Sequence, residues 1–155
     1  MLARNKVACR VVLTAVAMVL VFWPTRVTSQ SQNAEESVPA FHTEAPHAAL
    51  PDTLGPSLFA NVVVQNTYAL AARIKKVLYQ QPCYCHCDRS QGHKSLLDCF
   101  ATKHGSECGV CLSEALYTYE QNRKGKNAAQ IRQGIEKGEW RHVDISKYQT
   151  QLAAE

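Results

Sequence analysis

The apolar residues between positions 57 and 140 recur mainly at the spacing of a helix. The first such stretch has residues at alternating steps of four and three: Val63, Thr67, Leu70, Ile74 and Val77. These steps place the side chains on one face of an amphipathic helix. Basic residues fall in its last turns, where they complement the negative end of the helix dipole, and Pro82 ends it.

Three further helices are expected after this first one. A short helix ends before Gly105, a longer one runs from about 107 to 122, and the last covers 128 to about 137, with Ile131 and Ile135 facing inward. The longer helix has one face made of Cys108, Leu112, Ala115 and Tyr119. No stretch alternates as a half-buried strand would. The pattern therefore predicts an all-α fold, a small helical bundle of about four helices around a cysteine-rich loop.

The first 29 residues have the pattern of an export signal. Basic residues precede an apolar run from Val11 to Trp23, and small residues at Val27–Ser29 have the spacing of a cleavage site. The run is short for a membrane span, which needs roughly twenty apolar residues. We expect a signal peptide, residues 1–29, and an exported protein that is periplasmic, at the cell surface or secreted. The alternative is an uncleaved anchor, attached to a membrane through residues 7–23.

The rest of the chain divides by composition. Residues 30–56 are rich in Ser, Ala, Pro and Glu, and we expect a disordered linker there. A cysteine-rich helical metal-binding domain follows over residues 57–145, and residues 146–155 form a tail. The domain is too small for a large core, so a metal ion or disulfides would help to stabilise it.

The distribution of charge argues against a nucleic-acid partner. The net charge of the whole chain is +4. Four basic residues and no acidic one precede residue 30, whereas the remainder has 13 Lys and Arg against 13 Asp and Glu. A neutral domain has no electrostatic footprint for a phosphate backbone. We therefore expect no nucleic-acid partner.

Six of the seven cysteines and three of the six histidines lie between positions 83 and 111. Three cysteines alternate within Pro82–Cys87, and in an extended segment they would point to the same side. Thiols so close in sequence would form strained disulfides with one another, so a metal suits them better. The candidate metal ligands are Cys83, Cys85, Cys87, Cys99, Cys108 and Cys111, together with His86, His93 and His104.

Cys108 and Cys111 are three residues apart at the start of the expected longer helix. Residues at this spacing are neighbours on the helix surface, and a helix N-terminus lowers the pKa of a thiol. The pair, the alternating trio and Cys99 together predict one shared site.

Five short segments resemble a known family. The segments are Pro82–Cys87, Gly92–His93, Ser95–Leu96, Asp98–Phe100 and Cys108–Cys111. In order and spacing they resemble the bacterial exported proteins named for a PCYCGC motif, over roughly residues 60 to 140. Two features depart from that family: His86 stands where the named motif has glycine, and the lipoprotein cysteine common there is missing. The resemblance implies an exported, cysteine-rich, metal-binding module.

Thiolates with imidazole form a soft ligand set that suits Cu(I) first and zinc next. Six thiols exceed the four ligands of one structural zinc, which favours copper, bound for metal handling or for structural stabilisation. Acidic residues lie near the cysteines without a nucleophilic serine motif, so we expect no enzyme.

Two alternatives remain open at this point. Six cysteines in an exported domain could form three disulfides, giving a stapled structural protein or an accessory protein of a membrane assembly. Cys108 and Cys111 could instead form a thiol redox module, although the surrounding sequence lacks the βαβ pattern of a thioredoxin-like site.

Overall fold

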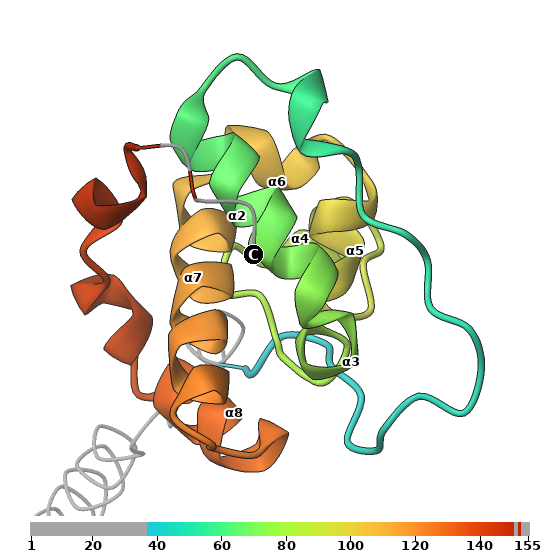
Figure 1. The fold of residues 1–155 in the computed structure, drawn as a ribbon. Helices are drawn as coiled ribbons and strands as arrows, with labels where there is room; N and C mark the ends of the chain where they lie inside the picture. Colours follow the sequence, from blue (N-terminus) through green and yellow to red (C-terminus); the bar gives the residue numbers. More distant parts are fainter. Residues whose placement is uncertain (1–36, 151, 153–155) are drawn as a thin grey trace, which may run out of the picture. The chain divides into compact units, whose positions relative to one another are not determined.

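The computed structural model describes residues 37–150 and 152 (Figure 1). The expected signal peptide or anchor and the start of the expected linker lie outside the described residues. The described part contains helices and no strand, so the all-α class is confirmed. Its α-helices are α2 Val62–Arg73, α3 Lys75–Leu78, α4 Cys87–Ser90, α5 Leu96–Ala101, α6 His104–Glu107, α7 Gly109–Arg123 and α8 Ala128–Glu136. Its 3-10 helices are η1 Pro56–Leu58, η2 Glu139–His142 and η3 Ile145–Tyr148.

The first expected helix is present but divided. The side chain of Asn61 caps α2 by accepting hydrogen bonds from the backbone N–H groups of Val63 and Val64, at 2.9 and 3.3 Å. At Ile74 the backbone leaves the helical region, with φ −121° and ψ 26°, and α3 begins at the next residue. Ile74 and Leu78 are both buried in the same core cluster, so the division still leaves the apolar face covered.

Helix α7 lies at the centre of the domain and runs beside α2 (Figure 1). Its successive residues Ala115, Leu116 and Tyr117 are buried in three different core clusters. The sequence predicted a single buried face, but neighbours surround this helix on several sides. Burial on several sides makes α7 the element against which the rest of the domain is placed.

Helix α8 closes one end of the domain. Asn127 and Gln130 form a capping box, in which each side chain accepts a hydrogen bond from the other residue's backbone N–H. Ile131 and Ile135 are fully buried against Tyr117, which confirms their expected inward orientation.

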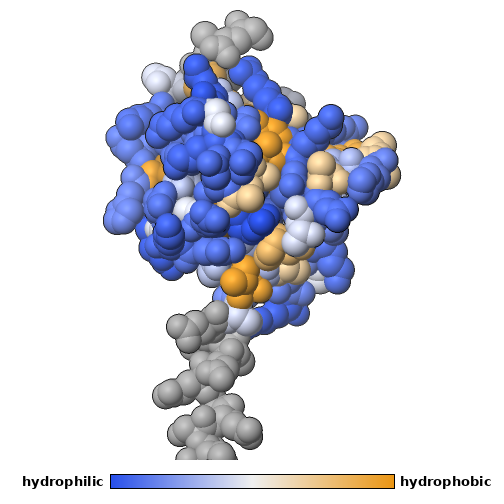
Figure 2. Space-filling model, turned by 90° about the horizontal axis from the view of Figure 1, so that it is seen from below, coloured by the Kyte–Doolittle hydropathy of each residue, from blue (hydrophilic) through white to orange (hydrophobic). Residues whose placement is uncertain are grey.

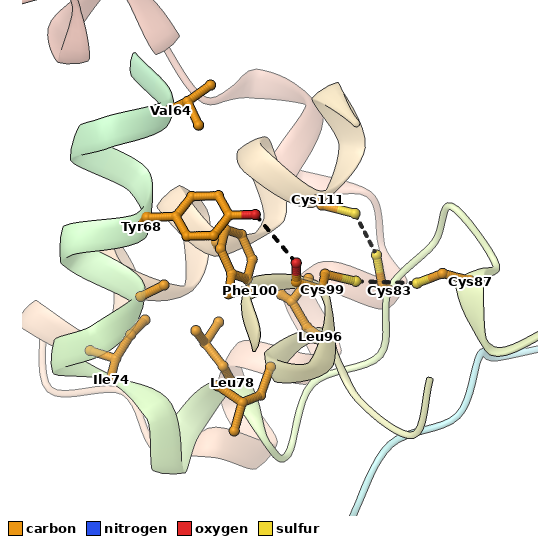
Figure 3. Packing of buried hydrophobic residues seen from close by; sticks show 13 residues of the cluster. Val64, Tyr68, Ile74, Leu78, Cys83, Cys87, Leu96, Cys99, Phe100 and Cys111 are labelled. Carbon is orange, nitrogen blue, oxygen red and sulfur yellow. Dashed lines mark hydrogen bonds between the residues drawn. The ribbon is translucent and has the colours of Figure 1, made fainter. Parts of the chain in front are cut away.

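The largest core cluster joins the aromatic and aliphatic core to the cysteines (Figure 3). Tyr68 and Phe100 are fully buried with an edge-to-face ring arrangement, their centroids 4.9 Å apart. The Tyr68 hydroxyl donates to the carbonyl oxygen of Thr102 at 2.7 Å. The cysteines therefore sit at the edge of a packed core rather than on a surface loop.

Residues 37–55 contain no helix or strand. Leu50 and Leu54 nevertheless pack against the largest core cluster, and the backbone N–H of Leu54 donates to the carbonyl of Phe100 at 2.9 Å. Farther along the chain, the Asn66 side chain donates to the carbonyls of Tyr148 and Thr150 within the expected tail, each at 2.8 Å.

Most apolar side chains of the described part are covered. Figure 2 shows one face that is mostly hydrophilic and interrupted by separate hydrophobic patches. The exposed large hydrophobic side chains in the described range are Val38 and Leu58. None of the described helices combines the length and apolarity that a membrane crossing requires.

Candidate metal centre

Five elements bring cysteine and histidine side chains to one place. The loop after α3 provides Cys83 and Cys85, and α4 begins at Cys87. Helices α5, α6 and α7 provide Cys99, His104 and Cys111, respectively. Cys83, Cys87, Cys99 and Cys111 point toward one another in Figure 3. All six cysteines of the described part are free thiols.

Three sulfur atoms form what we call the sulfur triangle, made of Cys83, Cys85 and Cys111. The Sγ atom of Cys83 lies 3.4 Å from those of both Cys85 and Cys111, and the third edge is 3.6 Å. Nε2 of His104 lies 3.8 Å from Sγ of Cys85. Two thiolates on one tetrahedral ion with bonds of about 2.3 Å are separated by about 3.8 Å. The sulfur triangle therefore has nearly the spacing of three thiolates on one tetrahedral ion, and His104 lies beside Cys85 and Cys111 as a candidate fourth ligand.

Two other sulfur atoms form the sulfur pair, Cys87 and Cys99. Their Sγ atoms are 3.2 Å apart, and Nδ1 of His93 lies 3.3 Å from Sγ of Cys99. The rings of His93 and His104 approach edge to face, with centroids 5.3 Å apart. The two histidines are half-buried, whereas both sulfurs of the pair are buried.

The triangle and the pair form one continuous cluster. In four overlapping groups, ligand atoms lie within 4.8 Å of one another. These groups are Cys83–Cys99–Cys111, Cys83–Cys85–Cys87, Cys85–His104–Cys111 and Cys87–Cys99–His104. Because thiolates from both sets occur together in two of these groups, the cluster can hold a soft metal ion by several ligand combinations.

Cys108, His86 and His93 belong to none of these groups within the described residues, although His93 contacts Cys99. Cys108 is the N-cap of α7, with φ −122° and ψ 109°, and its side chain is half-buried. The helix then turns Cys111 into the cluster and leaves Cys108 outside it. His86 has Nδ1 4.0 Å from a carboxylate oxygen of Asp88, so its ring points to that carboxylate rather than to the sulfurs.

One thiol of the metal-free cluster, that of Cys85, has a lowered pKa. Contacts with Cys111 and Cys83, and with the imidazole of His104, lower the pKa of Cys85 to about 5. The contact with Cys85 in turn raises the pKa of His104. Metal binding requires the thiolate form, so Cys85 offers a first ligand without further deprotonation at neutral pH.

Glu114 is a residue of the site that the sequence analysis did not select. Its side chain is fully buried, and one carboxylate oxygen accepts a hydrogen bond from the backbone N–H of Tyr84 at 2.9 Å. Burial raises the pKa of Glu114 to about 8. It follows Cys111 by three residues on α7, which is the spacing of neighbours on one helix face. Glu114 thus ties the loop of Cys83 and Cys85 to the helix of Cys111.

The fold and the site together define a small, all-α, cysteine-rich domain with a buried thiolate and imidazole cluster suited to a metal ion. The chain belongs to the family described as proteins of unknown function with a PCYCGC motif, whose model matches residues 16–141. The expected family is therefore confirmed. Comparisons with curated proteins and with solved structures found no match.

His86 occupies the glycine position of the family's motif, and its backbone explains why that position favours glycine. Its φ of 55° and ψ of 37° lie in the left-handed region. Among the residues that the structure describes, His86 is the only one other than glycine with a positive φ. This conformation costs an L-residue about 1–2 kcal/mol, and glycine avoids the cost. The turn it makes, with the N–H of His86 donating to the carbonyl of Cys83 at 3.0 Å, directs Cys87 toward Cys99.

We predict that His86→Gly raises the free energy of unfolding of the metal-free, reduced protein by about 1 kcal/mol. Its metal content should equal that of the unsubstituted protein, because the ring does not reach the cluster. Urea unfolding and elemental analysis measure the two quantities. A lower metal content in this variant would instead make the imidazole of His86 a ligand.

Proposed function

We propose that this protein is an exported binding protein for a soft metal ion, Cu(I) in preference to zinc, which it holds for metal handling or for its own stability. One observation carries the proposal. Five thiols and the imidazole of His104 from five separate elements converge with ligand atoms within 4.8 Å in overlapping groups. A core tolerates single neutral thiols, but five sulfurs and an imidazole gathered this closely form the ligand set that a soft cation prefers.

The number and type of ligands support copper over zinc. One zinc ion in a structural site takes four ligands, which the sulfur triangle and His104 would supply. Cys87 and Cys99 would then be left as buried thiols beside an already complete site. Cu(I) prefers soft thiolates and is satisfied by several of the overlapping combinations.

The alternatives from the sequence are less well supported. A redox module at Cys108 and Cys111 needs their two sulfurs together, whereas Cys111 contacts Cys83 and Cys85. A set of disulfides requires one partner for each cysteine. The sulfur of Cys83 lies 3.4 Å from those of both Cys85 and Cys111, so its position favours neither partner. We propose a binding role rather than an enzymatic one, because the polar groups around the cluster are ligands or hold ligands in place. Export is proposed on the signal-like pattern of residues 1–29.

The test uses protein exported by its own host and purified anaerobically. Elemental analysis is combined with thiol titration before and after addition of a chelator. We expect at least one copper ion per chain, with cluster thiols that react only after chelation. One zinc ion and no copper would overturn the preference for copper. Absence of both metal and reactive thiols would overturn the proposal in favour of disulfides.

A further inference from the structure

The sulfur pair has its own histidine and is not needed to complete the triangle. We infer that Cys87, Cys99 and His93 form a second ion site, for Cu(I), beside the sulfur triangle, so that the domain has a two-ion centre. The inference rests on the proposed function and adds the number and placement of the ions. Sγ of Cys99 lies 3.2 Å from Sγ of Cys87 and 3.3 Å from Nδ1 of His93, so Cys99 contacts both of the other ligands.

The backbone places His93 at the pair through specific contacts. After the single turn of α4, Gly92 adopts a left-handed φ of 68°, which lets the chain reverse without a side-chain clash. The N–H groups of Gln91 and His93 both donate to the carbonyl of Cys87, at 2.8 and 3.3 Å. The next residue, Lys94, donates its N–H to the Asp98 carboxylate on α5 at 2.6 Å. His93 is therefore fixed between the helix of Cys87 and the helix of Cys99.

The number of available ligands favours a second ion at the sulfur pair. The alternative is that the pair supplies additional ligands to the ion at the sulfur triangle. The sulfur triangle and His104 already provide the four ligands that a tetrahedral ion accepts. Two thiolates and one imidazole are fewer ligands than a structural zinc uses, but they suit Cu(I), a d¹⁰ ion that is stable at low coordination. His104 also lies within 4.8 Å of Cys87 and Cys99, so it stands at the boundary between the two sites.

Charge gives a second argument. Four of the five sulfurs belong to side chains that are at most 3% exposed, so thiolates there are costly unless a cation neutralises them. One monovalent ion would leave most of the thiols protonated or their charge uncompensated. A second ion replaces those protons. Cys83, Cys99 and Cys111 lie within 4.8 Å of one another, so a thiolate from this group can bridge the two ions.

The test titrates the reduced protein anaerobically with Cu(I), supplied as its acetonitrile complex, against a chromophoric Cu(I) chelator. We expect the unsubstituted protein to bind about two ions per chain. His93→Gln should weaken the second ion by at least about tenfold and leave the first unchanged. The matched control is His86→Gln, which removes an imidazole outside the cluster and should leave both ions unchanged.

Copper X-ray absorption of the unsubstituted, fully loaded protein gives a readout that does not depend on any variant folding. A short copper–copper scattering path is expected from two ions that share a thiolate. One bound ion without that path would overturn the inference while the proposed function stands. No bound Cu(I) at all would overturn the proposed function itself. An effect of His86→Gln equal to that of His93→Gln would also overturn the assignment of His93.

Discussion

Replacing Cys111 by serine should abolish metal binding at the sulfur triangle, whereas replacing Cys108 by serine should leave it intact. Cys111 is fully buried, and its sulfur contacts both Cys83 and Cys85. A ligand that binds only the folded state stabilises it by about 3–4 kcal/mol at free concentrations about 100 to 1,000 times its dissociation constant. Cys111→Ser should lose about that much of the free energy of unfolding measured with metal present.

Urea unfolding with and without metal, together with elemental analysis, measures this effect. Cys108→Ser is a matched control, since both cysteines come from the same Cys-x-x-Cys segment and both substitutions exchange sulfur for oxygen. It should keep the metal content and lose much less stability than Cys111→Ser, because Cys108 packs against the core from a half-buried position and contacts none of the cluster sulfurs. Equal losses in the two variants would contradict the geometry and favour a functional Cys108–Cys111 pair.

The helical periodicity of the chain predicted most of the fold. Ile131 and Ile135 were correctly expected to face inward, because α8 packs on one side only and keeps a narrow apolar face. The same reasoning failed for α7. There, Leu116 and Thr118 are fully buried, although neither lies on the face that the spacing selected. A helix surrounded by neighbours has no single polar face, and periodicity cannot detect that before the neighbours are known.

The sequence selected the cysteines of the site but not the way in which they are grouped. The alternation of Cys83, Cys85 and Cys87 predicts a common side only while the backbone is extended. The left-handed turn at His86 ends that condition, yet the three sulfurs still lie within 4.8 Å of one another, and Cys87 also contacts Cys99. Nothing in the spacing indicated the contact with Cys99. The family's glycine at that position was a signal for it, because glycine is the residue that adopts a positive φ without strain.

The sequence also did not predict that Cys108 lies outside the cluster, for a related reason. The spacing of three residues predicts that the two cysteines are neighbours on one helix. The structure starts α7 at Gly109, so Cys108 remains in an extended N-cap conformation while Cys111 is inside the helix. The helix thus starts two residues later than the expected position of about 107, which leaves Cys108 outside it, and helix boundaries are the least certain part of a periodic pattern.

Gly105→Ala should destabilise the domain and weaken metal binding together. Gly105 is buried on α6, directly after His104. A Cβ atom there would lie 2.8 Å from the backbone carbonyl oxygen of Cys99 and 3.1 Å from the hydroxyl of Tyr68. The carbonyl belongs to a packed helix, so α6 must move away. We expect a loss of about 1–3 kcal/mol in the free energy of unfolding, typical of overpacking and larger than the gain of about 1 kcal/mol in helix propensity.

Because His104 precedes Gly105, the same displacement should move its imidazole away from Cys85. Cu(I) competition should then show an affinity at least about tenfold lower, as when the support of a ligand is lost. Gly109→Ala is the matched control, since a Cβ atom at Gly109 would have no neighbour within 4 Å. It should leave both stability and affinity close to those of the unsubstituted protein. If Gly105→Ala lowered stability but kept the full affinity, His104 would not be a ligand, and the triangle would have to bind its ion through sulfur alone.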